Sequence, residues 1–445
     1  MTFEALFPDS WPIRSALSEL AAAPIKLIHF WIELPLLMFL STLAAMLFRP
    51  PDLKTVPIDR VAFVVLVAVL LVRICLHKLR FQLYPASWPL LGLALLGLWG
   101  AVTQPYSPQA WSLFAAKWMV PLVFFHAAAL LFQEQASLQK LETFLLIILC
   151  YLTAISILWL FGWKQFIFPR FITDESIGIH ADRARGPFLQ AVANGVSINL
   201  LAVIALDSFR RGRLRGILAW GLLTAVPLAL LATKTRAVWI SAALSIIWLV
   251  FFGSARKRRR VAFGVCLVSI ITGGILFVYR NGSEMFADRL VDRSPVDFRT
   301  EMYSAGLQMF TEKPLLGWGN EWDVQPEIEK RVSSFHPDYY IFHNTFLELA
   351  VQRGVLGLGL YVWLMICLLK LPKNNTHCTE QDVAFCSPHF LKLWPLLLLI
   401  YVVNASAVVM NYQFVNALLF TIAGILAAQG HHFREVPSET GRSVS

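Results

Sequence analysis

Long apolar runs recur from one end of this chain to the other. Several reach about 18 residues or more, the length that a helix needs to cross the ~30 Å hydrocarbon core of a bilayer. The chain is 57% hydrophobic and 15% charged, whereas a soluble chain of this size carries roughly 25% charged residues. The sequence therefore predicts an all-α, polytopic membrane protein.

The apolar runs predict about twelve transmembrane helices. In chain order, these spans are 28–48, 58–76, 86–103, 110–132, 141–161, 187–207, 214–232, 236–253, 260–279, 344–369, 390–410 and 412–429. They divide the chain into a cytoplasmic N-terminus (1–27), helices one to nine (28–279), a large polar loop (280–343), helices ten to twelve (344–429) and a cytoplasmic tail (430–445).

Two clusters rich in arginine, at 210–215 and 256–260, place nine positive charges in two short loops. Such clusters favour the cytoplasmic side of a membrane. They account for much of the formal net charge of +10 without a nucleic-acid partner. With both loops cytoplasmic, both termini are expected on that side, and the segments 162–186, 233–236 and 280–343 face the opposite side.

Other patterns exclude several classes of protein. The first 23 residues lack a basic start, an apolar run and a cleavage site, so we expect no removable signal peptide. The six cysteines show no CxxC or Cys/His spacing, which predicts neither a disulfide framework nor a zinc site. No repeat with a period of about 20–50 residues is visible, which argues against a solenoid.

The turn between the seventh and eighth predicted spans holds two cations, Lys234 and Arg236. Almost no loop separates them from the membrane, and a positive charge near the bilayer interior costs a few kcal/mol unless it meets a partner or a water-filled cavity. Lys234 can reach the lipid headgroups. Arg236 begins an apolar helix, so we expect it to face a partner.

A second pair of arginines, Arg183 and Arg185, precedes Pro187 at the start of the sixth predicted span. A proline suits the first turn of a helix, and the amide groups and positive dipole end there favour an anion. One guanidinium group can bind two phosphate oxygens through two parallel N–H···O hydrogen bonds. Asn194 lies two turns further on and adds a hydrogen-bond donor. The alternative is an interfacial loop held by salt bridges.

The large loop 280–343 carries seven Lys/Arg and eleven Asp/Glu residues, so it is acidic. It does not attract phosphate as a whole, although a single arginine within it can. Arg299 precedes a predicted amphipathic helix whose apolar face would be Tyr303, Leu307 and Phe310. Solvated salt bridges are the favoured interpretation for three other arginines of this loop, Arg289, Arg293 and Arg331.

His343 ends the large loop and stands before the tenth predicted span. The apolar part of that span, 355–369, covers about 22 Å at 1.5 Å per residue, which is short of the ~30 Å core. Glu348, Gln352 and Arg353 are therefore expected at membrane depth, facing protein or a cavity. A neutral imidazole accepts a proton from a hydroxyl at neutral pH, which makes His343 a candidate base.

The segment from His343 through Asn344 to Leu347, followed by Arg353-Gly354 and Gly357-Leu358, resembles the signature of the O-antigen ligase/polymerase superfamily. Three further motifs resemble the same superfamily, in the same order along the chain: Arg185-Gly186-Pro187 with Asn194, the segment Thr235 to Trp239, and the segment Pro314 to Gly319. Together the motifs cover roughly residues 180–370.

The resemblance implies a GT-C-like glycosyltransferase of about twelve helices in a bacterial inner membrane, acting on the periplasmic face. Its donor would be a glycan linked to undecaprenyl diphosphate, and it would need neither a metal nor another cofactor. The leading interpretation is an O-antigen ligase that transfers the glycan to lipid A–core in lipopolysaccharide biosynthesis.

The resemblance also implies roles for individual residues. Arginines matching Arg236, Arg183 or Arg185, and one residue of the large loop would bind the diphosphate. Arg299 is the expected large-loop residue, with Arg289 and Arg293 as alternatives. The histidine matching His343 would be the base, and the supporting positions are Lys234, Asn194 and Asn344.

Four alternatives stay open. An O-antigen polymerase would extend the glycan on its own carrier, and no residue identifies the acceptor. A protein O-oligosaccharyltransferase is less favoured because the C-terminal tail is short. A metal-dependent transferase would use Asp52, Asp59 or the pair Asp174-Glu175. A transporter of the same lipid is disfavoured because no repeated halves are visible and the polar residues cluster at one face.

Overall fold

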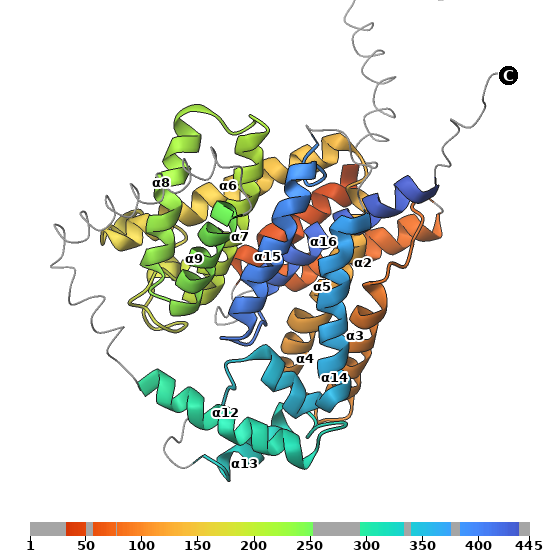
Figure 1. Cartoon of the computed structure of the whole chain (residues 1–445), viewed down its shortest axis with the longest axis vertical. Helices are drawn as coiled ribbons and strands as arrows, with labels where there is room; N and C mark the ends of the chain where they lie inside the picture. Colours follow the sequence, from red (N-terminus) through yellow and green to blue (C-terminus); the bar gives the residue numbers. More distant parts are fainter. Residues whose placement is uncertain are drawn as a thin grey trace, which may run out of the picture.

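The computed structural model describes residues 33–49, 57–76, 78–251, 294–332, 340–374 and 383–435. Within these ranges the chain is made of helices joined by turns, with no strand (Figure 1). The expected all-α class is confirmed for this part of the chain. The predicted span 260–279, the arginine cluster 256–260 and the candidates Arg289 and Arg293 lie outside it.

Each of the other predicted spans overlaps a helix. The helices are Glu33–Phe48, α2 (Ile58–Cys75), α3 (Ser87–Val102), α4 (Pro108–Phe114) continuing through a π-helical turn (Ala115–Met119) into α5 (Val120–Leu131), α6 (Gln135–Leu160), α7 (Ala191–Arg210), α8 (Gly216–Ala232), α9 (Arg236–Phe251), α14 (Thr345–Lys370), α15 (Pro388–Ala405) and α16 (Gln413–Glu435).

Five helical stretches in the described residues are long and apolar enough to cross a membrane. They are Pro108–Leu131, Gln135–Leu160, Ala191–Arg210, Thr345–Lys370 and Pro388–Ala405. Shorter apolar helices, among them α3 and α9, pack beside them. The multi-pass character of the chain thus has support from helix length and composition, while the count of twelve spans stays a prediction.

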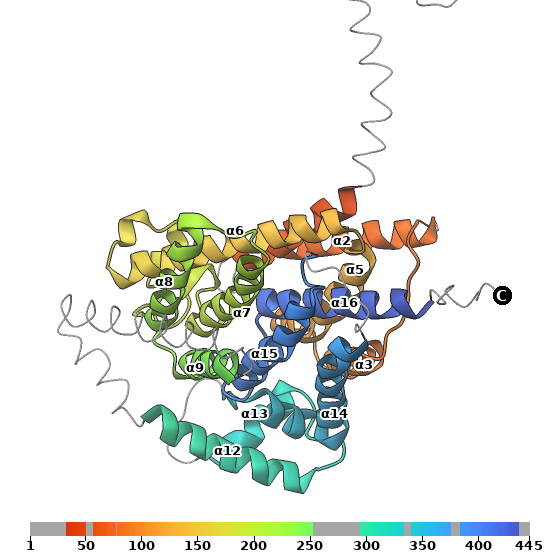
Figure 2. The ribbon, with the colours of Figure 1, turned by 45° about the horizontal axis from the view of Figure 1, so that its top comes forward.

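The core of the bundle is built around α16, which is buried on nearly all sides between Phe414 and Ala428. Its closest neighbour is α5, and a Cβ atom at Gly424 would lie 2.0 Å from the carbonyl oxygen of Phe125. Only a glycine permits this approach of two helix backbones. Figure 2 shows α16 running through the middle of the bundle, below α6 and above α12.

A buried ion cluster joins α6, α7 and α15. The Arg211 guanidinium donates to the carboxylates of Glu142 and Asp207, and Asp207 also accepts a hydrogen bond of 3.1 Å from the hydroxyl of Ser387. Both carboxylate side chains are 1% exposed. Arg211 was expected only as a topology signal, and it also ties three helices together.

Two helices of the large loop, α12 (Ser294–Glu312) and α13 (Glu321–Glu329), cover one end of the bundle (Figures 1 and 2). Their small core includes Met302 and Met309. The predicted apolar face was wrong, because Leu307 is 58% exposed. The helix instead turns its methionines toward α13 and α14. Arg331 binds the carboxylates of Glu312 and Glu327, which confirms its expected salt bridges.

Helix α14 is broken at Gly354, whose φ of 61° and ψ of −159° are not helical. The backbone groups released by the break pair with the turn that follows α12. The amide of Val355 donates to the carbonyl of Pro314 at 2.7 Å, and the amide of Trp318 donates to the carbonyl of Val351 at 2.8 Å. The motif 314–319 therefore docks directly onto the broken helix and fixes its first half.

Candidate active site

Three contacts hold His343 at the start of α14. The Asn344 side chain caps the helix by accepting hydrogen bonds from the amides of residues 346 and 347. The Thr345 hydroxyl donates to the carbonyl of Val408 at 2.9 Å. The Tyr303 hydroxyl lies 3.4 Å from the carbonyl of His343. These contacts keep His343 at a φ of 50°, a conformation that a non-glycine residue adopts only when its surroundings impose it.

The His343 imidazole is half-buried against the ring of Phe298, with 6.1 Å between ring centroids. Burial, which is the largest cause, and the positive charges of Arg299 and His180 together lower the pKa of His343 to about 4. The imidazole is therefore neutral at pH 7. It can accept a proton from a hydroxyl group beside it.

The same electrostatic contacts bring together segments that are far apart in the sequence. Arg299 lies in the second turn of α12, and His180 belongs to the loop that leads to Arg183 and Arg185. Both act on His343. The large-loop arginine that the sequence favoured thus lies near the candidate base, and the 162–186 loop reaches the same place.

Arg185 is completely buried. Its guanidinium donates to the carbonyl of Ile172 at 3.1 and 3.2 Å, to the carbonyl of Ile177 at 2.6 Å, and to the carbonyl of Asp174. The side chain therefore closes the 172–185 loop upon itself. Its hydrogen-bonding capacity is directed to the backbone of this loop and away from solvent.

Asn194 is also fully buried and lies below this loop. Its amide nitrogen donates to the carbonyl of Ala184 and to the hydroxyl of Ser156, both at 2.9 Å. A Cβ atom at Gly186 would lie 2.6 Å from the Asn194 amide oxygen, so Gly186 gives the loop room to settle on the helix. Asn194 thus positions the loop that carries the arginines.

Arg183 and Lys234 meet at one carboxylate. The Arg183 Nε atom lies 3.7 Å from Asp182 Oδ1, and the Lys234 Nζ atom lies 3.8 Å from Asp182 Oδ2. The amide of Ala184 donates to the carbonyl of Ala232 at 3.0 Å. The structure therefore places the two cationic segments singled out in the sequence side by side, with Asp182 exposed between them.

Arg236 is the first residue of α9 and is half-buried. One and a half turns further along α9, the hydroxyl of Ser241 accepts a hydrogen bond of 3.0 Å from the Asn404 amide of α15. The carbonyl of Ser406, two residues after Asn404, lies 3.4 Å from the hydroxyl of Tyr303. Helix α15 thus links the Arg236 end of α9 to the Tyr303 contact beside the histidine.

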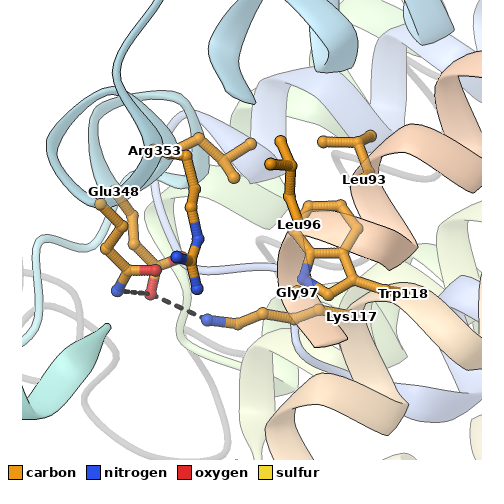
Figure 3. Close-up of a pocket in the computed structure, with 9 residues that line it drawn as sticks. Leu93, Leu96, Gly97, Lys117, Trp118, Glu348 and Arg353 are labelled. Carbon is orange, nitrogen blue, oxygen red and sulfur yellow. Dashed lines mark hydrogen bonds and ion pairs between the residues drawn. The ribbon is translucent and has the colours of Figure 1, made fainter. Parts of the chain in front are cut away.

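A second polar cluster lies on the first half of α14. The Lys117 ammonium lies 2.8 Å from the Glu348 carboxylate, and the Gln352 amide donates to the same carboxylate at 3.4 Å. Arg353 donates to the side-chain oxygen of Asn320. Figure 3 shows Lys117 and Arg353 converging on Glu348. These contacts confirm that the three polar residues of α14 face protein.

Sequence reasoning missed the partners of this cluster. Lys117 lies 231 positions from Glu348 along the chain, and it sits in the π-helical turn Ala115–Met119. Such turns are frequent at functional sites. A lone lysine inside an apolar run was the available signal, because a charge at that depth needs a partner.

Two of the residues considered as metal ligands make other contacts. Asp174 accepts hydrogen bonds from the backbone and hydroxyl of Ser176, and Glu175 pairs with Lys164 at 2.9 Å. Asp59 is buried in the first turn of α2, and Asp52 lies outside the described residues. In the ranges that the structure describes, no three His, Cys, Asp or Glu side chains form a group with the spacing of metal ligands.

Comparison with known proteins adds one match. Residues 217–362 match the family model of the O-antigen ligases. The matched segment includes Arg236, Arg299, His343 and the break at Gly354. No curated protein matches the chain at a significant level. Over residues 217–362 the chain is thus similar to the O-antigen ligase family, in agreement with the resemblance of its sequence motifs.

Proposed function

We propose that this protein is an O-antigen ligase of the bacterial inner membrane. It transfers a glycan from undecaprenyl diphosphate to a hydroxyl group of lipid A–core on the periplasmic face, within a GT-C-like bundle of about twelve helices. The observation that carries the proposal is the position of His343, a neutral imidazole beside Arg299 at the end of a membrane helix.

The reaction needs a base for the acceptor and cations for the leaving group. The acceptor oxygen attacks the anomeric carbon of the glycan while its proton passes to His343. The bond from that carbon to the phosphate oxygen breaks, and its electron pair leaves with the undecaprenyl diphosphate. An in-line attack inverts the anomeric centre, which linkage analysis of the product tests.

Fixed positive charges stabilise the departing diphosphate without moving during the reaction. We assign this role to Arg236, Arg183 and Arg299, with Lys234 in support. A guanidinium group supplies a fixed positive charge without a metal ion, which is what the leaving group requires. EDTA leaves the activity unchanged on this proposal, and loss of activity in EDTA would favour the metal-dependent alternative.

Arg185, Asn194 and Asn344 hold the site in shape on this proposal. Arg185 binds the carbonyls of its own loop, Asn194 binds the carbonyl of Ala184, and Asn344 caps α14. These contacts favour a positioning role for all three side chains. Arg183 is then the residue of the 183–185 segment that meets the donor.

One reconstitution tests the function and its nearest rival. Purified protein is mixed with lipid-linked glycan and either lipid A–core or unextended lipid-linked repeat units. Transfer to lipid A–core identifies a ligase, whereas growth of the glycan on its carrier identifies a polymerase. Absence of transfer to both acceptors, with a folded protein and an intact donor, would refute a glycosyltransferase.

A further inference from the structure

A pocket separate from His343 lies between α3, the α4–α5 helix and the first half of α14. It consists of two adjoining hollows that share five residues, Gly97, Lys117, Trp118, Gln352 and Arg353. The inner hollow reaches Glu348 (Figure 3). The outer hollow reaches the side chains of α4 and the start of α13.

Glycines of α3 create the space for this pocket. A Cβ atom at Gly97 would lie 2.4 Å from the Trp118 indole, and a Cβ atom at Gly100 would lie 2.0 Å from the Arg353 guanidinium. A larger residue at either position would displace the side chain that lines the pocket. The Trp118 indole and the Arg353 guanidinium therefore pack against the parts of α3 that carry no side chain.

The charges of the pocket are balanced. Lys117 is paired with Glu348 at 2.8 Å. Arg353 binds Asn320, and the carboxylates of Asp323 and Glu348 both act on it electrostatically. An anion entering the pocket would meet carboxylates as well as cations. The lining therefore does not select for phosphate, in contrast to the arginines near His343.

The lining instead combines aromatic rings with planar polar groups. Trp118 and Phe114 line the wall, and Trp322 is 63% exposed at the rim. The Gln352 amide and the Arg353 guanidinium lie beside them. A sugar ring offers apolar C–H faces for an indole and hydroxyl groups that both donate and accept hydrogen bonds. Hydroxyl groups can join existing ion pairs without breaking them.

We propose that this pocket is a carbohydrate-binding subsite, in which a neutral sugar ring of one of the glycan substrates stacks on Trp322 at the mouth and directs hydroxyl groups into the two hollows. The identity of the sugar as part of a substrate rests on the proposed function. The subsite lies on the same half-helix that begins after His343, so a bound sugar would be fixed relative to the candidate base. Either the donor glycan or the core of the acceptor can provide the ring.

Direct binding tests the subsite without requiring turnover. Saturation-transfer NMR is recorded on detergent-solubilised protein with two soluble probes from the host strain. One is the repeat-unit oligosaccharide released from the donor lipid by mild acid, and the other is the core oligosaccharide released from lipopolysaccharide. The probe that binds identifies the source of the sugar.

Three variants test whether the probes bind in this pocket. Trp118→Ala and Trp322→Ala are expected to weaken binding at least tenfold, and Trp322 is exposed enough that its variant should fold normally. Trp220→Ala removes an exposed indole of α8 and should bind as the wild type does. Lack of binding by the wild-type protein, or wild-type affinity in Trp322→Ala and Trp118→Ala, would overturn the proposal.

The His343→Ala variant separates the subsite from the reaction. It should bind the probe with wild-type affinity, because His343 does not line the pocket. If the transfer assay fails for the wild-type protein while this binding persists, the proposed function fails and the subsite stands. If transfer succeeds and no probe binds, the subsite fails alone.

Discussion

The guanidinium of Arg299 acts on the imidazole of His343 and helps to lower its pKa to about 4. A histidine with such a pKa is neutral at pH 7, but it is a weak base. On the proposed function, the diphosphate of the donor binds between these residues. The negative charge of the diphosphate would offset the positive charge of Arg299 and raise the pKa of the imidazole. The donor would then strengthen the base that acts on the acceptor.

The pH dependence of transfer should differ between the empty and the donor-bound protein. The neutral form of His343 is required, so activity falls as the pH drops through its pKa. The value of kcat/KM for donor should fall only near pH 4, because it reports the empty site. The value of kcat should fall at a higher pH, because it reports the bound site. Identical acid limbs in both profiles would contradict this coupling.

Removing the positive charge of Arg299 should shift the acid limb of the kcat/KM profile to higher pH. In Arg299→Gln, the pKa of His343 in the empty site rises above its wild-type value, although burial still holds it below 6.5, so kcat/KM begins to fall at a higher pH than in the wild type. The KM for donor also rises if the residue binds the diphosphate. Lys330→Gln removes a positive charge from the same module, on a side chain that is 65% exposed. That control should leave the pH profile unchanged.

Replacing His343 should slow transfer strongly and leave the fold intact. Loss of a general base costs roughly 10²–10⁴-fold in rate, so transfer by His343→Ala should fall by about that factor in the reconstituted assay. The helix cap and the Thr345 contact do not involve the imidazole, so thermal unfolding should stay close to that of the wild type. A folded variant with wild-type kcat would remove the histidine from the mechanism.

The sequence reveals part of this site because some residues are out of place in an apolar chain. A cation at the start of α9 and a histidine before α14 stand out against their surroundings, so the sequence alone makes Arg236 and His343 candidates. Arg183 and Arg185 look equivalent in the sequence. Their environments differ because the backbone of residues 172–177 closes around the Arg185 guanidinium, and no local pattern predicts that closure.

The rest depends on contacts between distant segments. Lys117 and Glu348 are joined only when α14 packs beside the α4–α5 helix. The buried face of α12 was mispredicted because α13 and α14 pack against Met302 and Met309. Leu307 also fits the helical spacing of an apolar face, but it stays exposed. Hydropathy predicts that helices form and bury a face. It does not say which neighbour each face meets.

Arg185 should be needed for stability more than for binding the diphosphate. Its replacement removes the donor from three carbonyl groups of the loop, of which that of Ile172 is buried, at a cost of about 1–3 kcal/mol for each group that water cannot reach. Arg185→Lys should lower the thermal unfolding temperature, because an ammonium lacks the planar geometry of the guanidinium. Arg183→Lys should unfold like the wild type and show a raised KM for donor. The reverse pattern would assign the diphosphate to Arg185.

The break in α14 should tolerate no side chain at Gly354. This residue has a φ of 61°, and a Cβ atom there would lie 2.3 Å from the carbonyl oxygen of Leu315. A larger residue must therefore push the 314–319 turn away from the helix. Because that contact fixes the first half of α14, Gly354→Ala should reduce both the unfolding temperature and kcat.

Gly359→Ala is the matched control, since it lies in the same helix and a Cβ atom there would meet nothing within 4 Å. An alanine is favoured over glycine by about 1 kcal/mol inside a helix, so this variant should be as stable as the wild type or slightly more so. Unfolding and transfer are measured on both variants in the same detergent. Equal stability and activity for the two would mean that the break at Gly354 does not hold the histidine in position.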